Sequence, residues 1–420
     1  MKRSAGPISP HARKLVWMLT AVYFASYFTR INFAVMLVKI CADLGAPKTA
    51  VAIVLTGLTV TYGAGQILSG IIGDKLPAPV LLSIGLALAT LCNITLPLTS
   101  SISLMTAIWC VNGFAHSLLW PPIVRIMSTC LTDEEYSYGA VRVSWGSSFA
   151  TVALYLLCPL LLNVLNWKSI FFLCAAVSAS ICLLWTLLSA RLLPPTPSLD
   201  SAQGSPDAPP SSTGIPLPST VHLPLILIMA SILLQGTLRD GVTNWMPSYL
   251  SEAFSLSAES AIVTAVIPAI FSILSFSFFG YLHRKLLTNE VFCSAIIYAA
   301  AVPVTLLLYW SNHPSFPTLF SALLLAILIA FMHGINLMLI TVVPKRLIKS
   351  GKVSTYSGLL NAFTYVGASI SGYGFAYLAQ TFGWSATILT WAIISLIGAL
   401  LCLIAAPMWK VFRQKYADTP

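Results

Sequence analysis

The sequence predicts an all-α membrane protein in which twelve transmembrane helices form two six-helix, pseudo-symmetric bundles. Three observations predict this fold: few residues are charged, long apolar runs recur along the chain, and one polar segment divides these runs six and six. Of the 420 residues, 57% are hydrophobic and 8% are charged, whereas about a quarter of the residues in a soluble domain are charged. Because so little polar surface cannot cover a chain in water, most of the chain must face lipid.

The apolar runs have the length of membrane-spanning helices. Such a helix needs about 20 mostly apolar residues, whereas a strand of a membrane barrel has about 10 residues of alternating character. The first run is too long for a cleavable signal peptide, and no small-residue cleavage site follows a short hydrophobic region. The twelve predicted spans are 15–41, 49–73, 79–98, 102–125, 138–162, 169–190, 223–250, 260–282, 290–310, 316–340, 353–379 and 385–408.

The segment between the sixth and seventh spans is rich in proline and serine and has no hydrophobic pattern. Because it cannot bury enough apolar surface to offset the entropy lost on ordering, we expect a disordered linker. Six spans on either side are typical of two repeats that enclose a site near the membrane midplane. The predicted parts are a cytoplasmic N-terminus (1–14), an N-terminal bundle (15–190), the linker (191–222), a C-terminal bundle (223–408) and a cytoplasmic tail (409–420).

Lysine and arginine are unevenly shared between the two sides of the predicted membrane. If the N-terminus is cytoplasmic, the outer loops hold only Lys39, Lys48 and Lys168, and all the other loop lysines and arginines lie inside. This bias predicts that both termini are cytoplasmic, and the short loops and compact chain favour a plasma (inner) membrane. The net charge of +10 is spread over many short loops, so it reflects topology and does not favour a nucleic-acid partner.

Two arginines lie near the middle of apolar runs, Arg30 in the first span of one half and Arg239 in the first span of the other. Each costs about 2.5–3.5 kcal/mol on insertion scales, and the headgroups are about 15 Å away, too far for snorkelling. The one deep carboxylate, Asp240, directly follows Arg239, so it is expected to point about 100° away around the helix. We therefore expect the arginines to face each other across a central cavity and to bind a ligand.

The chemistry of two guanidinium groups favours an anionic ligand. Each group offers a planar fork of donors that suits carboxylate or phosphate, and a phosphate monoester carries about −1.5 to −2 charges near pH 7. Two arginines match such a dianion, although a dicarboxylate or a sugar acid would also satisfy them. The further residues expected in this cavity, where packing is the alternative role for each, are Tyr23, Tyr27, Tyr62, Gln66, Trp120, Trp145, Trp245, Asn361 and Tyr365.

Titratable groups that could carry a proton are scarce in the spans. Arginine does not titrate usefully, and we interpret His116 and His333 as packed polar residues, which leaves Asp240 as the one candidate proton carrier. Exchange of one anion for another is the simpler mechanism. No nucleophile–base set, metal-ligand spacing or nucleotide loop is present, so we expect no enzyme activity, no cofactor and no metal.

Five stretches resemble the organophosphate:phosphate antiporters of the major facilitator superfamily, which include the glycerol-3-phosphate, hexose-6-phosphate and glucose-6-phosphate transporters. They are YFASYFTRINFAV (23–35), GFAHSLLWPPIVR (113–125), TLRDGVTNWMPSYL (237–250), GLLNAFTYVGASISG (358–372) and FGW (382–384). The resemblance covers most of the predicted core in order, but not the linker. It implies the major facilitator fold, alternating access, and a substrate phosphate held by Arg30 and Arg239.

The same resemblance implies a gate in the loop GIIGDKL (70–76), where Asp74 and Lys75 match the gating residues and Asp240 is a further coupling candidate. The counterpart loop GYLHRKL (280–286) has Arg284 where the family has an acid. Several family charges are also replaced. Because positive and negative members are lost together, no buried charge is left unpaired. The replacing residues are Ile31, Gln66, Phe149, Asn244 and Ala269.

We therefore expect a monomeric secondary transporter for a small organic anion, favouring a phosphorylated sugar or glycerol compound exchanged for inorganic phosphate. Two alternatives remain open. One is a proton-coupled symporter for a carboxylate or sugar acid that uses Asp240. The other is a membrane sensor that binds a sugar phosphate and signals to a partner.

Overall fold

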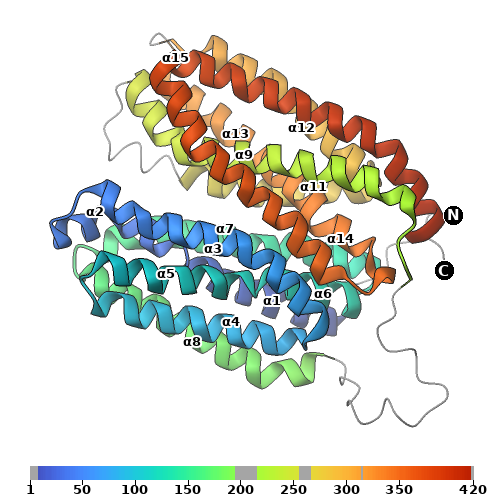
Figure 1. The fold of residues 1–420 in the computed structure, drawn as a ribbon, viewed down its shortest axis with the longest axis horizontal. Helices are drawn as coiled ribbons and strands as arrows, with labels where there is room; N and C mark the ends of the chain where they lie inside the picture. Colours follow the sequence, from blue (N-terminus) through green and yellow to red (C-terminus); the bar gives the residue numbers. More distant parts are fainter. Residues whose placement is uncertain (1–7, 194–214, 255–265, 314–315, 418–420) are drawn as a thin grey trace.

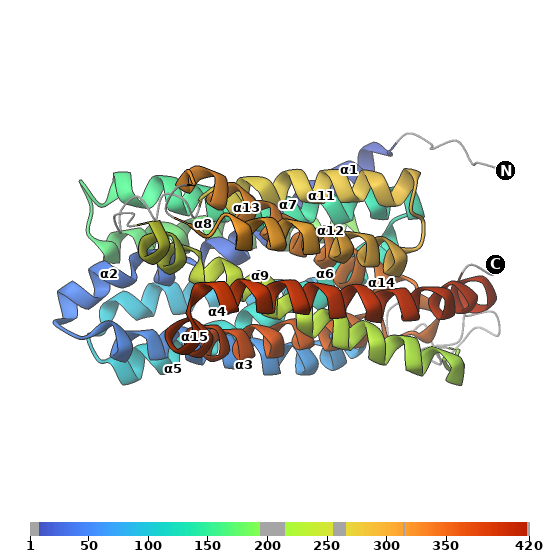
Figure 2. The same ribbon diagram turned by 90° about the horizontal axis from the view of Figure 1, so that it is seen from above.

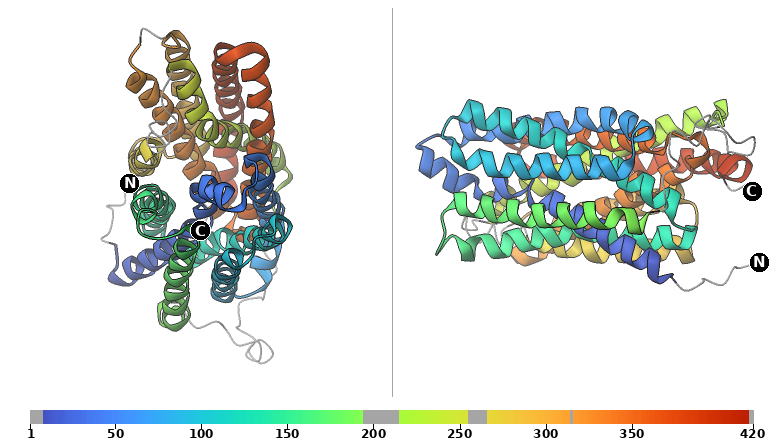
Figure 3. Two further views of the ribbon diagram at one scale, coloured as in Figure 1. Left: turned by 90° about the vertical axis from the view of Figure 1, so that its left-hand side faces the viewer. Right: turned by 90° about the horizontal axis from the view of Figure 1, so that it is seen from below.

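A computed structural model describes residues 8–193, 215–254, 266–313 and 316–417. Every regular element in these residues is helical. The first half of the chain forms one bundle and the second half forms a neighbouring bundle (Figure 1). Seen end-on, the two bundles lie one above the other (Figure 3). Large apolar side chains such as Leu183, Phe278 and Leu400 are at least half exposed, as expected of a surface that faces lipid.

The N-terminal bundle is built from spans that alternate in direction, some of which consist of two elements. The elements are α1 (Pro10–Phe28), α2 (Asn32–Leu44), α3 (Lys48–Lys75), α4 (Ala78–Thr95), η1 (Leu96–Leu98), α5 (Ile102–Ser117), α6 (Trp120–Cys130), α7 (Asp133–Leu161) and α8 (Trp167–Leu192).

The C-terminal bundle follows the same up-and-down course. Its elements are η3 (Ser219–Val221), α9 (His222–Phe254), α11 (Val266–Lys285), α12 (Glu290–Trp310), α13 (Thr318–Asn336), η4 (Leu337–Val342), α14 (Val343–Lys345), η5 (Ile348–Ser350), α15 (Val353–Phe412) and η6 (Arg413–Ala417).

The prediction of twelve spans is confirmed, although the described residues contain eleven helices that are long and apolar enough to cross a membrane. The last of them has 65 residues, about three times the length that one crossing needs. It bends at Gly383, whose φ of 79° and ψ of 173° are not helical. The chain doubles back there (Figure 1), so α15 supplies the two final spans. Only glycine adopts this backbone conformation readily.

Two spans expected as single helices are broken. Span 102–125 is interrupted at Leu118 and Leu119, because Pro121 and Pro122 have no N–H groups with which to continue the helical ladder. Span 15–41 is interrupted at residues 29–31. There the carbonyl of Thr29 accepts bonds from Asn93 Nδ2 at 3.0 Å and Asn112 Nδ2 at 3.2 Å.

The edges of the predicted linker are ordered. Helix α8 continues to Leu192 and η3 begins at Ser219. Ile215 donates its N–H to the Lys349 carbonyl at 2.9 Å and accepts the Tyr416 hydroxyl at 2.8 Å. The end of the linker thus packs on the C-terminal bundle. The middle of the linker (194–214) and the start of the predicted eighth span (260–265) lie outside the described residues.

The start of α1 and the end of α15 lie at the same end of the molecule (Figure 2). We call this the basic end, because α3, α8 and α11 also finish there with Lys75, Arg191 and Lys285. Its most buried charge is Glu290, which is fully buried in the C-terminal bundle. Arg413 binds this carboxylate at 2.9 Å and Trp409 donates to it at 2.8 Å.

Candidate functional site

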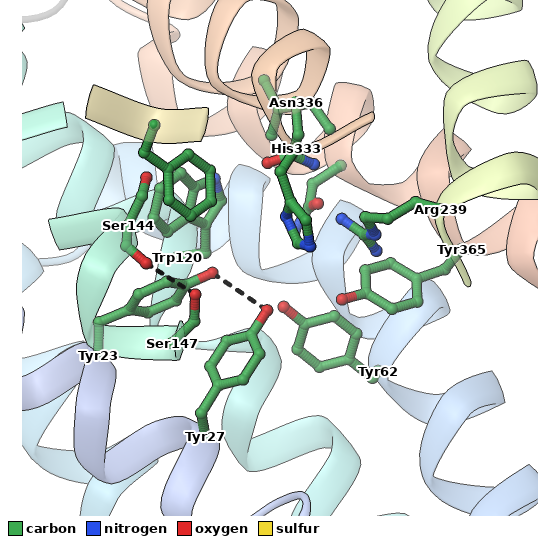
Figure 4. A pocket seen from close by; sticks show the side chains of 13 residues that line it. Tyr23, Tyr27, Tyr62, Trp120, Ser144, Ser147, Arg239, His333, Asn336 and Tyr365 are labelled. Atoms are coloured by element: carbon green, nitrogen blue, oxygen red, sulfur yellow. Dashed lines mark hydrogen bonds between the residues drawn. The ribbon is translucent and has the colours of Figure 1, made fainter. Parts of the chain in front are cut away.

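A cavity lies between the two bundles. Both halves of the chain line it, and most of the lining side chains carry a polar atom (Figure 4). The lining residues are Tyr23 and Tyr27 of α1, Tyr62 of α3, Trp120 of α6, Ser144 and Ser147 of α7, Arg239 of α9, Phe276 of α11, His333 and Asn336 of α13, Ile340 of η4, and Asn361 and Tyr365 of α15.

Part of this lining is predictable from the sequence. The predicted residues that line the cavity are Tyr23, Tyr27, Tyr62, Trp120, Arg239, Asn361 and Tyr365, whereas Trp245 does not line it. The polar side formed by α7 and α13, which holds Ser144, Ser147 and Asn336, is not among the predicted residues, and His333, expected as a packed polar residue, also lines the cavity. The one available signal was the three-residue spacing of Ser144 and Ser147. That signal is weak, because serine in a membrane helix commonly serves close packing.

Arg30 stands behind the wall of the cavity. Its guanidinium carbon lies 4.2 Å from the ring centroid of Tyr27 and 4.7 Å from that of Tyr62, and both rings line the cavity. No carboxylate pairs with Arg30 anywhere in the described ranges. The expectation that the arginines face each other directly is therefore wrong, because two tyrosine rings occupy the space in front of Arg30.

Arg239 is held by a carboxylate. Its Nε lies 2.7 Å from Asp240 Oδ1 and its Nη2 lies 3.0 Å from Asp240 Oδ2. The expectation that Asp240 points away from Arg239 is wrong. The two Cα–Cβ bonds do diverge around the helix, but the long arginine side chain curls back far enough for its fork to meet the short aspartate. The Arg239 side chain is 11% exposed and that of Asp240 is 25% exposed.

Two tyrosines from opposite bundles connect the arginines. The ring centroids of Tyr62 and Tyr365 are 4.5 Å apart in an edge-to-face arrangement, and the guanidinium carbon of Arg239 lies 5.9 Å from the Tyr365 centroid. The order Arg30, Tyr62, Tyr365, Arg239 therefore crosses from one bundle to the other. The ring faces stabilise the buried cations, while the phenolic hydroxyls point into the cavity (Figure 4).

Two further predicted site residues also lie away from the cavity. Gln66 is fully buried, and neither polar atom of its amide has a hydrogen-bond partner in the described parts of the chain. Trp145 packs against Trp17, with ring centroids 6.5 Å apart, and lies 5.0 Å from the guanidinium carbon of Arg142. Neither residue lines the cavity.

Asp74 closes the seam between α3 and α15 at the basic end. Its Oδ1 accepts the N–H of Ser354 at 2.9 Å, and its Oδ2 accepts the N–H of Thr355 at 2.9 Å and the Thr355 hydroxyl at 2.6 Å. These N–H groups belong to the first turn of α15, whose own N-cap residue Lys352 makes no capping bond. A carboxylate of one bundle therefore caps a helix of the other. Lys75 is exposed and forms no ion pair across this seam within the described ranges.

Glycines let the two backbones of this seam touch. A Cβ on Gly70 would lie 2.7 Å from the Ser354 carbonyl oxygen, and a Cβ on Gly358 would lie 3.0 Å from the Gly70 Cα. Close by, Lys345 forms an ion pair with Asp133 at 2.6 Å across the bundles. The basic end of the cavity is thus closed by backbone contact and by charge.

The described part of the chain contains no cluster of three or more histidine, cysteine, aspartate or glutamate side chains that could hold a metal ion. What the cavity offers is a compensated arginine, a second arginine behind tyrosine rings, and neutral donors and acceptors on α7, α13 and α15. Such a set can bind a small anion that also carries hydrogen-bonding groups.

Residues 19–372 match the model of the Major Facilitator Superfamily. The match spans well over half of the chain, so the chain belongs to this superfamily. The fold agrees: a bacterial homologue of the iron transporter ferroportin, solved in an outward-facing state, superimposes with a TM-score of 0.74 at 12% identity. That likeness covers 95% of this chain and 100% of the solved chain.

Relatives of similar length carry names connected with phosphorylated compounds. The probable hexose phosphate transport protein of Chlamydia trachomatis is 23% identical over 93% of this chain and 90% of its own. The glycerol-3-phosphate transporter of Bacillus subtilis is 24% identical over 86% of this chain and 85% of its own. The membrane sensor protein UhpC of Escherichia coli is 22% identical over 94% of this chain and 91% of its own.

Proposed function

We propose that this protein is a secondary transporter that carries a small phosphorylated sugar or glycerol compound by alternating access, in exchange for inorganic phosphate. The observation that carries the proposal is Arg30, a partly buried cation that two tyrosine rings cover and no described carboxylate compensates. The names of the relatives in Chlamydia trachomatis and Bacillus subtilis support the phosphorylated class. The basic end faces the cytoplasm in this proposal, because lysine and arginine gather there.

In the proposed cycle, the anionic group of the substrate lies in the cavity, where it meets the fork of Arg239 and the hydroxyls of Tyr27, Tyr62 and Tyr365, while Arg30 attracts it from behind the tyrosine rings. The uncharged part of the substrate lies against the neutral polar wall of α7 and α13. A bound anion links groups from both bundles, so it favours the closed cavity from which either gate can open.

Exchange follows from the charge balance of the cavity. Two guanidinium groups and one carboxylate leave one net positive charge, and that charge belongs to Arg30. Closing the empty cavity would bury this cation without a partner, which is costly. Either the organic phosphate or inorganic phosphate removes that cost, so reorientation proceeds with one or the other bound.

The proposal differs from a proton-coupled carboxylate symporter in the role of Asp240. In the structure this carboxylate is held by both oxygens against Arg239. It therefore serves to compensate the arginine in our proposal. A symporter would instead require Asp240 to leave Arg239 and accept a proton in each cycle.

The test is counterflow in proteoliposomes that contain the purified protein and are loaded with inorganic phosphate. We expect labelled phosphate to enter only when phosphate is inside, and external glycerol-3-phosphate or hexose-6-phosphate to compete, whereas a monocarboxylate does not. Uptake into phosphate-free vesicles that a proton gradient drives would contradict the proposal. Binding of a sugar phosphate to the folded protein without any exchange would favour the sensor.

A further inference from the structure

The two bundles meet along a second seam, between α7 and α11, that differs from the seam of Asp74. The loop at the end of α11 (280–286) is the counterpart of the loop at the end of α3 (70–76), and it has Arg284 in place of the acid. Within the described residues, Arg284 donates from Nε to the Gly280 carbonyl of its own helix at 3.2 Å. The hydroxyls of Ser148 and Ser272 meet across this seam at 2.6 Å, but no described carboxylate makes here the bridge that Asp74 makes at the other seam.

The start of α7 does not need such a bridge. Thr132 and Glu135 form a capping box, in which the Glu135 N–H binds the Thr132 hydroxyl at 3.4 Å and the Thr132 N–H binds Glu135 Oε2 at 3.2 Å. Asp133, which directly follows Thr132, forms an ion pair with Lys345. An arginine would in any case be repelled by the positive end of a helix, so Arg284 has no role as a cap.

Arg284 instead lies close to a second arginine, Arg142 of α7. Gly280 of α11 packs against Val141 of α7, because a Cβ on Gly280 would collide with the Val141 side chain. Arg142 directly follows Val141, and Arg284 comes about one helical turn after Gly280, so the two arginines flank the same contact. Arg142 lies 3.9 Å from the Tyr138 ring centroid and 5.0 Å from that of Trp145. Over the described ranges, neither arginine pairs with a carboxylate.

This arginine pair is open to the lipid. Arg284 is exposed, and the side chains beside it on α11 are exposed and apolar or aromatic, with Phe278 at 60% and Tyr281 at 54%. Arg142 is the tenth residue of α7, about 14 Å from the basic end of that helix. That depth lets its long side chain reach the headgroup level. Tyrosine and tryptophan beside it are typical of the membrane interface.

We infer that the seam between α7 and α11 binds the phosphate of an anionic phospholipid, which lies between Arg142 and Arg284. Two forked cations match one phosphodiester group, whose non-bridging oxygens accept bonds from both. The acyl chains then cover the exposed apolar face of α11. The lipid replaces the acid that this seam lacks, because it joins one bundle to the other and stabilises the state that is closed at the basic end.

The test compares two lipids by the thermal unfolding midpoint of the purified full chain in nanodiscs. We expect phosphatidylglycerol to raise the midpoint above the value in phosphatidylcholine, and Arg142→Gln or Arg284→Gln to remove about half or more of this difference. The matched control is Arg191→Gln, which removes an exposed arginine of α8 at the same end but outside the seam. It is expected to keep the difference. Equal loss in the control would assign the effect to surface charge and overturn the inference.

A charge-reversed variant guards against a simple failure to fold. Arg284→Asp would place an acid opposite Arg142, so we expect it to be stable in phosphatidylcholine and insensitive to phosphatidylglycerol. A variant that still needs the anionic lipid would overturn the inference. Inorganic phosphate is the second probe: a stabilisation by free phosphate that Arg142→Gln abolishes would assign the seam to a soluble anion and not to lipid.

Discussion

Arg30 and Arg239 occupy comparable places on the first span of each bundle, yet the protein holds them in different ways. Arg30 lies in a break between α1 and α2, where tyrosine rings cover it and no described acid pairs with it. Arg239 lies within the continuous helix α9 and is bound by both oxygens of Asp240. Only the arginine of the N-terminal bundle therefore brings an uncompensated charge to the cavity.

Arg30 and Arg239 therefore contribute unequally to the proposed site, although their sequence positions are similar. A substrate meets a full positive charge from one bundle and a neutral ion pair from the other. In the proposed site, Arg30 supplies the net attraction to an anion. The ion pair of Arg239 and Asp240 limits the negative charge that the cavity can balance.

Loss of the arginine fork gives the largest expected effect. We expect Arg30→Lys to lower phosphate counterflow about 100-fold, because lysine keeps the charge but loses the planar fork that the tyrosine rings hold, at a position that no described acid compensates. We expect Arg239→Lys to lower it about tenfold, since lysine can still pair with Asp240. Initial exchange rates at matched protein content measure both. Equal losses in the two variants would break the proposed asymmetry.

Loss of the Asp240 charge tests the role of the ion pair that holds Arg239. We expect Asp240→Asn to keep exchange and to lower the apparent KM for phosphate about tenfold, because the cavity gains a second uncompensated cation. Asp43→Asn is the matched control. The Asp43 carboxylate accepts a hydrogen bond from Trp167 Nε1 at 3.1 Å, and neither residue lines the cavity. Abolished transport in a folded Asp240→Asn protein would instead support a proton carrier.

The tyrosine rings in front of Arg30 are expected to support exchange through the cation–π contact of their faces with the guanidinium group. Tyr62→Leu removes a ring that lies 4.7 Å from the guanidinium carbon, and we expect exchange to fall about fivefold, as about 1 kcal/mol of cation–π energy implies. Tyr62→Phe keeps the ring, so it should lose less than half as much. If phenylalanine costs as much as leucine, the hydroxyl and not the ring face is what the site uses.

The smallest expected effect concerns the gate. Asp74→Asn keeps the shape of the side chain but removes the charge that caps α15. This change is expected to lower the stability of the closed state by about 1 kcal/mol. We expect a cysteine introduced by Asn336→Cys, in a background without other cysteines, to react about fivefold faster with an impermeant maleimide from the basic end. Lys75→Gln, which removes an exposed charge beside Asp74, is the control and should leave the rate unchanged.

Local patterns predicted the spans well because lipid imposes one requirement on every helix, a run of apolar residues of fixed length. The same patterns identified Arg239, Tyr27, Tyr62 and Tyr365, since polar and aromatic groups deep in a span are rare. Asp240 was misjudged because the helical period fixes the direction of Cβ only. It does not fix where the end of a four-torsion side chain lies.

The position of Arg30 could not be predicted from its own neighbourhood. The break beside it is stabilised by Asn93 of α4 and Asn112 of α5, which are distant in sequence. The neutral wall of Ser144, Ser147 and Asn336 was missed for a similar reason. It becomes a wall only when α7 and α13, from opposite bundles, lie on either side of one cavity.

The break at residues 29–31 also has a mechanical consequence. Helix α2 has 13 residues and is joined to α1 through residues 29–31, where the regular helix is interrupted although Thr29 and Ile31 still donate to carbonyls four residues before them. A few such residues can absorb the change in backbone torsions that a hinge requires. An anion that pulls on Arg30 then acts on the pivot itself, so α2 can tilt over the cavity while α1 stays packed. Helix α9 has no such pivot at Arg239, so occlusion of the site would begin in the N-terminal bundle.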